Sequence, residues 1–358
     1  MKLCNFATCG ATTPLILSLR LSFETHCVFS ISRDSISNLP NRVSTNSYRR
    51  SIWVTVYMTS QYETALHVGE RLRAFRLGKG LSPEEVAAGT GLSRAAIYRY
   101  EAGQPIRVDA LGKIADFLEI SVASLFGVGS EFIATAAGFY ERTRQLEAMA
   151  DQISVLFGPI SYLLTTGNFD ALLKTVLTES VPEIAANRQN LDNQIDEIIA
   201  LLLERKAAYL RRRPNIVSLV SVAELEQVLR LGFVGCHGIT GEELKRRQSA
   251  ALVEVENVLG MLVDQPMGVQ IGLVEDSLPG ASFQILRSGA VAHVAVSPFR
   301  LGLYANIRVG VATITAAQDS VSMHQEVTAQ LWRNSLKGEE AANRVRSILE
   351  NARSERPA

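Results

Sequence analysis

The sequence predicts a mainly α protein with an N-terminal module of five short helices, a helical middle region, and a C-terminal α+β domain that contains a small, mostly antiparallel sheet. Three observations support this fold class. Helix start and stop signals follow one another closely over residues 68–126, and apolar residues recur at helical spacing as far as residue 213. After residue 269, short runs of alternating apolar residues are separated by turn residues, which is typical of strands. We therefore expect boundaries at 1–57, 58–128, 129–218 and 219–358.

The first two helices of the N-terminal module have clear limits. The first helix carries apolar residues on one face and ends near Gly78–Gly80. Ser82 is the expected N-cap of the second helix, with Pro83 at the first helical position and Glu85 three residues after the cap. Such a capping box with an N-terminal proline gives two independent start signals.

The other three helices begin and end as clearly. Ser93 precedes a helix over residues 94–101 that stops before Gly103, and a fourth helix follows Val108. The fifth helix begins at another serine cap, Ser121. The sharp turn between the second and third helices, at Gly89 and Gly91, has the spacing of a helix-turn-helix, so we interpret residues 58–128 as a DNA-reading module.

Four ordered segments of this module resemble the XRE family, the Cro and phage-repressor (lambda repressor-like) type of helix-turn-helix transcriptional regulator. These segments are L-S-P-E-E-V-A at 81–87, G-L-S-R at 91–94, I-Y-R-Y-E-A-G at 97–103 and L-G-K-I-A-D-F-L at 111–118. The resemblance covers about 60 residues and implies that the third helix enters the major groove of double-stranded DNA.

The resemblance also implies roles for individual residues. The positions that face bases are Arg94, Ala95, Tyr98 and Arg99. The positions that hold phosphates are Ser82, Ser93, Gly103 and Gln104. Arg76 and Glu101 match a structural ion pair that is common in the family, and two solvated charges are the alternative.

Arginine can donate two hydrogen bonds to guanine, whereas alanine offers only a methyl contact to thymine. We therefore expect a half-site that contains guanine, with phosphate anchoring as the alternative role of Arg94 and Arg99. Pro83 departs from the family, since many members have a glutamine there that contacts a phosphate. Proline has no such side chain and no amide hydrogen, so one phosphate contact is in doubt.

The net charge gives no steering toward DNA, because the chain has 36 basic and 36 acidic residues. Residues 66–127 contain eight basic and seven acidic residues, so only local asymmetry can favour DNA. Weak affinity per monomer would follow, and we expect a homodimer. No segment has the length of uninterrupted apolar sequence that a membrane span requires.

Residues 1–57 differ in composition from the rest of the chain. They hold only two acids, Glu24 and Asp34, and three of the four cysteines. We interpret this stretch as a disordered leader or an over-extended gene start, with translation beginning at Met58. An organelle transit peptide is the alternative.

Little in the second half indicates catalysis. We find no G-x-S-x-G, H-E-x-x-H, glycine-rich phosphate loop or C-x-x-C, and we expect no enzyme activity, metal or cofactor. Cys236 and His237 are adjacent without a second pair nearby, which makes a poor zinc site, so we expect Cys236 to be a buried structural residue. His293 and His324 are expected to serve packing or the surface.

Two function classes remain. The favoured one is a cytoplasmic, nucleoid-associated bacterial regulator of transcription whose C-terminal region dimerises and senses a small-molecule effector, in a pocket beside the sheet. The alternative is an antitoxin-like interaction module that binds a partner protein and binds DNA only to regulate its own gene. The size of the C-terminal region favours the sensor.

Overall fold

The computed structural model describes residues 67–127, 129–156, 158–182, 188–276 and 279–354. The chain divides into the units Met1–Tyr57 and Met58–Ala358, and the described residues all belong to the second. The leader expected at 1–57 therefore lies outside the described residues.

The N-terminal module consists of five described helices, as the start and stop signals predict. A helix over 67–78 is followed by α2 (Pro83–Thr90), α3 (Arg94–Glu101), α4 (Val108–Phe117) and α5 (Val122–Phe126). Their shared core contains the apolar residues that recur at helical spacing, which are Val68, Leu72, Phe75, Val86, Ile97, Leu111, Ile114, Leu118 and Leu125. Gly91 and Gly127 end α2 and α5 in the left-handed conformation, which glycine adopts without strain.

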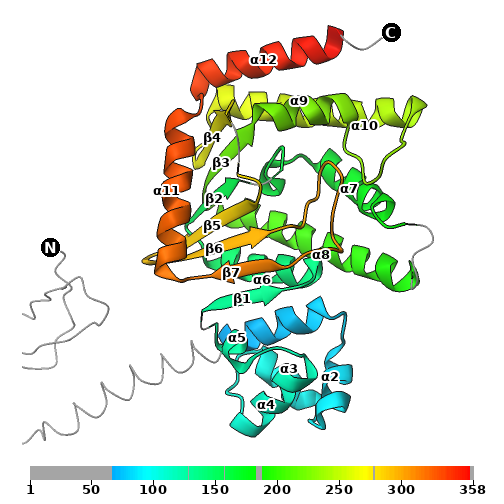
Figure 1. Ribbon diagram of the computed structural model, residues 1–358, viewed down its shortest axis with the longest axis vertical. Coiled ribbons are helices and arrows are strands. Elements are labelled where there is room, and N and C mark those ends of the chain that lie inside the picture. Colours follow the sequence, from blue (N-terminus) through cyan, green and yellow to red (C-terminus); the bar gives the residue numbers. More distant parts are fainter. Residues whose placement is uncertain (1–66, 128, 157, 183–187, 277–278, 355–358) are drawn as a thin grey trace, which may run out of the picture. The chain divides into compact units, whose positions relative to one another are not determined.

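The rest of the described chain is organised around one seven-stranded sheet in the order β1-β7-β6-β5-β2-β3-β4 (Figure 1). The parallel strands are β2, β3 and β4, and the other neighbours are antiparallel. The strands are β1 (Ser130–Ile133), β2 (Gln152–Leu156), β3 (Asn215–Ser221), β4 (Val269–Val274), β5 (Ser282–Ser288), β6 (Val291–Ser297) and β7 (Ala312–Thr315).

Helices connect the parallel strands and cover both faces of the sheet. The chain passes from β2 to β3 through a short 3-10 helix η2 and two α-helices, and from β3 to β4 through two more. A long helix, α11, crosses β4, β5 and β6 on one face, where Val321 joins a small core with Phe283 and Val294. The bounds are α6 (Ala136–Met149), η2 (Tyr162–Leu164), α7 (Gly167–Glu179), α8 (Arg188–Arg212), α9 (Val222–Leu231), α10 (Gly241–Asp264), α11 (Gln318–Asn334) and α12 (Gly338–Ser354).

Residues 129–218, expected to be a helical middle region, contain strands as well as helices. β1, β2 and most of β3 lie in this stretch, and β2 and β3 occupy interior positions of the sheet. Both faces of such strands are covered, so their sequences lack the alternation of a half-exposed strand. The alternating runs after residue 269 correspond to β4, β5, β6 and β7, so strands are present in this region as the alternation predicts.

The helical spacing of apolar residues after residue 136 hides a change from helix to strand. α6 ends at Met149 and β2 begins at Gln152. No described helix combines the length and the apolar character that crossing a bilayer would need.

Candidate functional site

The two helices of the helix-turn-helix begin at serine caps. The Ser82 hydroxyl accepts a hydrogen bond from the Glu85 amide at 3.2 Å, and the Glu85 carboxylate accepts one from the Ser82 amide at 2.7 Å. These hydrogen bonds from the Ser82 backbone and hydroxyl lower the pKa of Glu85. The Ser93 hydroxyl accepts from the Ala96 amide at 3.2 Å, so both caps orient their helices as the sequence predicts.

α3 has one buried and one exposed face. Ala96, Ile97 and Tyr100 are buried against the module. The four residues with predicted base-reading roles are all on the exposed face, and they are Arg94, Ala95, Tyr98 and Arg99. A helix that presents this face fits the dimensions of the major groove.

The two arginines of this face differ in their surroundings. Arg94 forms an ion pair with Glu84 of α2, and its guanidinium carbon lies 5.4 Å from the centre of the Tyr98 ring. Arg99 forms no ion pair with any residue that the structure describes. Arg99 is therefore free to reach DNA, whereas Arg94 must first leave Glu84. This carboxylate on α2 is a feature that the sequence analysis overlooked.

The candidate phosphate contacts are not equivalent. The N-terminus of α2 has Pro83, which lacks an amide hydrogen, and the acids Glu84 and Glu85 in its first turn, so it disfavours an anion beside Ser82. The first turn of α3 has no acid, which leaves Ser93 as the better placed of the two serines.

The loop after α3 offers less than predicted. Gly103 is buried and its amide donates to the Tyr100 carbonyl at 3.0 Å, so it has no free donor for a phosphate. The Gln104 amide donates to the Arg99 carbonyl at 2.9 Å, and only its exposed side chain remains available. We therefore remove Gly103 from the candidate contacts.

Arg76 and Glu101 are joined by a two-pronged ion pair. The Arg76 Nε and Nη2 atoms donate to the two carboxylate oxygens at 2.5 and 2.9 Å. A third hydrogen bond runs from Nη1 to the Leu81 carbonyl at 2.7 Å. Both side chains are more than nine-tenths buried, so this pair ties the first helix to the end of α3.

A second buried ion cluster joins the first helix to α6 and β1. Glu131 accepts hydrogen bonds from Arg71 at 2.7 Å and from Arg142 at 2.8 and 3.1 Å. Gln145 continues the contact by donating to the Glu70 carbonyl at 2.9 Å. Burial alone raises the pKa of Glu131, but the two guanidinium groups outweigh it and hold the pKa below its ordinary value.

This cluster was missed because its members are far apart in the sequence. Arg71 and Glu131 are 60 residues apart, and no motif connects them. The only local signal is the density of charged residues in α6, which usually indicates a solvated face.

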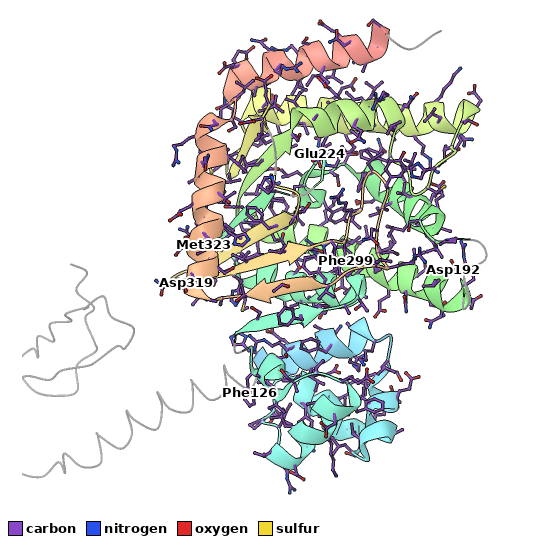
Figure 2. The ribbon with its side chains drawn as sticks, in the orientation of Figure 1. Phe126, Asp192, Glu224, Phe299, Asp319 and Met323 are labelled. Carbon is purple, nitrogen blue, oxygen red and sulfur yellow. The ribbon has the colours of Figure 1, made fainter. Side chains whose placement is uncertain are left out.

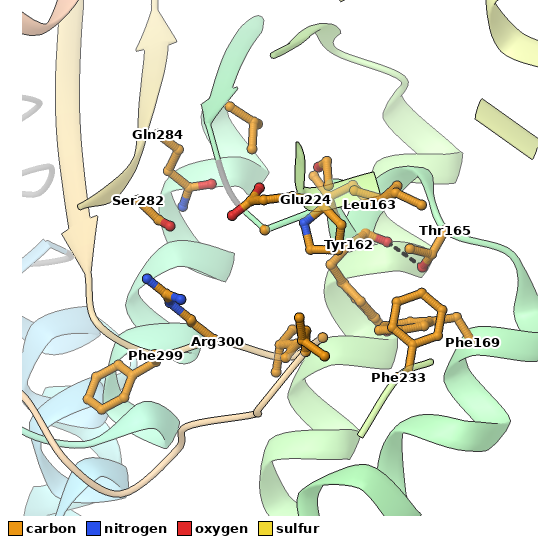
Figure 3. Close-up of a pocket in the computed structure, with 18 of the residues that line it drawn as sticks. Tyr162, Leu163, Thr165, Phe169, Glu224, Phe233, Ser282, Gln284, Phe299 and Arg300 are labelled. Atoms are coloured by element: carbon orange, nitrogen blue, oxygen red, sulfur yellow. Dashed lines mark hydrogen bonds between the residues drawn. The ribbon is translucent and has the colours of Figure 1, made fainter. Parts of the chain in front are cut away.

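A cavity of about 170 Å³ lies at the end of the sheet where β2 and β3 finish and β5 begins. One end of the cavity is aromatic, with Tyr162, Phe169 and Phe233 at its wall (Figure 3). The rings of Phe169 and Phe233 meet edge to face with centroids 4.9 Å apart. The carboxyl ends of parallel strands, beside a change in strand direction, are where open α/β sheets bind ligands.

The other end of the cavity is polar. Figure 3 shows Ser282, Gln284, Glu224 and Arg300 together on the side away from Phe169. Glu224 belongs to the first turn of α9 and Arg300 to the loop after β6. Glu224 and Phe299, although from separate elements, both lie at this end of the strands (Figure 2).

Cys236 is exposed, so the expectation of a buried structural cysteine is wrong. It lies in a loop after α9 rather than in a packed element. His293 on β6 is half-buried, and burial together with the nearby charge of Arg142 lowers its pKa to about 4. His293 is therefore neutral at neutral pH. The described residues contain no cluster of three potential metal ligands.

Comparison with known proteins assigns only the N-terminal module. Residues 72–125 match the family model HTH_3, Helix-turn-helix. No curated protein matches the chain. Among solved structures, TrmBL2, an archaeal chromatin protein whose structure shows a novel mode of DNA binding, is similar with 9% identity and a TM-score of 0.29.

That similarity covers 58% of this chain and 54% of TrmBL2, so the chain spans about half of that protein. At such a TM-score it carries no argument about function. The family match agrees with the capped helices, the turn between them and the exposed face of α3. Residues 72–125 belong to the XRE-type helix-turn-helix family.

Proposed function

We propose that this protein is a sequence-specific DNA-binding regulator of transcription that acts in the cytoplasm as a homodimer and responds to a small-molecule effector. The observation that carries the proposal is the exposed face of α3, where Arg99 and Arg94 flank Ala95 and Tyr98 beside an acid-free helix start. On such a helix, arginine side chains can donate two hydrogen bonds to a guanine and the alanine methyl can contact a thymine, both at base edges in the major groove.

The dimer follows from the charge balance of the module. Among the residues that the structure describes, six of the eight basic side chains of the module are in ion pairs, so few remain to attract phosphates. Two modules reading two half-sites about one helical turn apart would multiply their weak individual affinities.

The test is selection of binding sites from random duplex DNA by the purified full-length chain, in parallel with Arg99→Ala and Arg94→Ala. We expect a two-fold symmetric site that contains guanine, with relaxed preference at one position in at least one variant. Lys113→Ala is the control, because Lys113 is an exposed base of the same module on α4, outside α3. Equal weakening on every sequence would mean that the arginines only hold phosphates.

A second measurement addresses assembly. Sedimentation of the chain with and without the selected duplex should give a mass of two chains per site. One chain per site, with a single asymmetric half-site selected, would refute the dimer but leave sequence-specific binding intact.

A further inference from the structure

Two opposite charges face the cavity without forming an ion pair. Arg300 is close enough for its charge to lower the pKa of Glu224, yet the two side chains are farther apart than the 4.0 Å that defines an ion pair. Burial has the larger effect, so the pKa of Glu224 lies above its ordinary value. A half-buried carboxylate that pairs with no cation among the described residues is unfavourable, and a cationic group placed beside it would relieve that cost.

A buried hydroxyl in the cavity wall is also without a partner. Tyr140 is 3% exposed, and its hydroxyl makes no hydrogen bond to the described residues. Buried polar groups are nearly always satisfied, so an orphan in a cavity wall indicates a group that a ligand satisfies. This hydroxyl gives a second, independent sign of a binding site.

The size of the cavity limits the apolar part of a ligand. A cavity of about 150 Å³ in another protein binds benzene, and the present one is about 170 Å³. An aromatic or branched aliphatic group would occupy the end formed by Phe169 and Phe233, and its polar head would lie between Glu224 and Arg300.

We propose that the cavity binds a small zwitterion of the amino-acid type with a hydrophobic side chain, its ammonium group on Glu224 and its carboxylate on Arg300. A purely anionic head would face the Glu224 carboxylate, and a purely cationic head would face the Arg300 guanidinium. Only a head that carries both charges satisfies both residues.

The same helix that lines the cavity also contacts the DNA-binding module. Phe139 and Tyr140 of α6 are in the cavity wall, while Arg142 and Gln145 of that helix bind Glu131 and the first helix of the module. A ligand that reorders Tyr140 can thus bias the position of the module. This regulatory part rests on the proposed function, whereas binding of the ligand does not.

Three probes that share a phenyl ring isolate the head group, namely L-phenylalanine, hydrocinnamate and phenethylamine. Titration calorimetry with the full-length chain should show L-phenylalanine binding at least about tenfold more tightly than either singly charged probe, the equivalent of one charged hydrogen bond. Equal binding of the three probes, tighter binding of a singly charged one, or no binding by any would overturn the proposal.

Charge variants provide a sharper test. Glu224→Gln should shift the preference toward hydrocinnamate, and Arg300→Gln should shift it toward phenethylamine. The matched controls are Glu226→Gln on the exposed side of α9 and Arg308→Gln, both outside the cavity wall, and they should change nothing. Loss of binding in the controls, or an unchanged preference in the cavity variants, would refute the assignment.

Tyr140→Phe separates a binding role from a structural one. Because the hydroxyl has no hydrogen-bond partner among the described residues, its removal should leave the unfolding midpoint unchanged or raised while weakening ligand binding about fivefold. A destabilised variant with normal binding would show that the hydroxyl serves the fold.

The regulatory part is tested on the selected DNA site. Saturating L-phenylalanine should change the DNA affinity of the wild-type chain and not that of Arg300→Gln. If the ligand binds without changing the DNA affinity, only the regulatory effect through α6 is refuted, and the binding site itself stands. Failure to select any DNA site would refute the proposed function and leave the calorimetric result standing.

Discussion

The most informative perturbation is Glu131→Gln, because this carboxylate lies between two arginines that connect the DNA-binding module to the sheet. Glu131 is 4% exposed, and Arg71 and Arg142 are both less than a tenth exposed. The substitution keeps the shape of the side chain but removes its charge. The NH₂ group of the new glutamine would then replace one carboxylate oxygen and face guanidinium groups, which can only donate hydrogen bonds.

The loss of stability in Glu131→Gln follows from the two guanidinium groups that are left without a charged acceptor. Three charge-assisted hydrogen bonds, at 2.7, 2.8 and 3.1 Å, lose their acceptor charge. Removing one partner of a buried ion pair costs about 3–5 kcal/mol, because the remaining charge is buried without compensation. Arg142 also donates a hydrogen bond to the Gln145 side-chain oxygen at 3.1 Å, which offsets part of this cost. We therefore expect the free energy of unfolding to fall by about 3 kcal/mol.

The assay is urea unfolding of the full-length chain, with Glu204→Gln as the control. Glu204 is 63% exposed and pairs with Arg144 at 3.7 Å, so its loss should cost less than about 1 kcal/mol. A Glu131→Gln variant within about 1 kcal/mol of the wild type would refute our account of this cluster.

The same cluster predicts the direction of the pH dependence. The pKa of Glu131 is lower in the folded chain than its ordinary value of 4.5, so its contribution is present above that pH. The contribution is lost as the pH falls through the folded pKa. The wild type should therefore lose more stability than Glu131→Gln between pH 5 and strongly acidic conditions, and parallel curves would contradict the sign.

Three further predictions concern the module and its contacts. Glu84→Gln should free Arg94 and tighten DNA binding a few-fold at low salt; gel-shift titration checks this, and weaker binding would contradict it. Ile97→Ala, at a fully buried site, should cost about 2–5 kcal/mol in thermal unfolding, and a smaller loss would mean that the core collapses around it. Gly138→Val should cost about 1–3 kcal/mol, because an added Cβ would lie 3.1 Å from the backbone of the crossing helix. Gly167→Ala, with open space around it, is the control and should be neutral.

The sequence predicted the module well because its signals are local. Serine caps, a proline at the first helical position and glycines at the turns act within four residues, and each capped helix begins where expected. The exposed face of α3 follows from the same periodicity, since burying Ala96, Ile97 and Tyr100 on one side of the helix leaves the other side exposed, with Arg94, Ala95, Tyr98 and Arg99. What could not be predicted is the pairing of Arg94 with Glu84, because it depends on how two helices cross.

The sheet was predicted only in part because its centre is covered on both faces. β2 and β3 are separated by η2, α7 and α8, so a helical period dominates the sequence around them. β2 pairs with β5 and β3 pairs with β4, and these partners are far apart in the sequence, so no local pattern predicts the pairing. The cavity could not be predicted for the same reason, because it lies where the ends of these paired strands meet.

α6 shows why the contact between the DNA-binding module and the sheet region was also hidden. Eleven of its fourteen residues are buried, among them Glu141, Arg142, Thr143 and Gln145. A helix that is buried all round loses the apolar stripe that identifies an amphipathic helix, and its charged residues imitate a solvated face. Gln145 and Glu141 of α6 bind the first helix of the module and Arg142 binds Glu131 of β1, while Phe139 and Tyr140 face the cavity. A charged helix soon after a DNA-binding module, separated from it here by β1, thus indicates a contact between that module and the sheet region rather than a solvated face. If the sheet region senses a ligand as proposed, mutations in α6 should alter the ligand response and leave the DNA sequence preference unchanged.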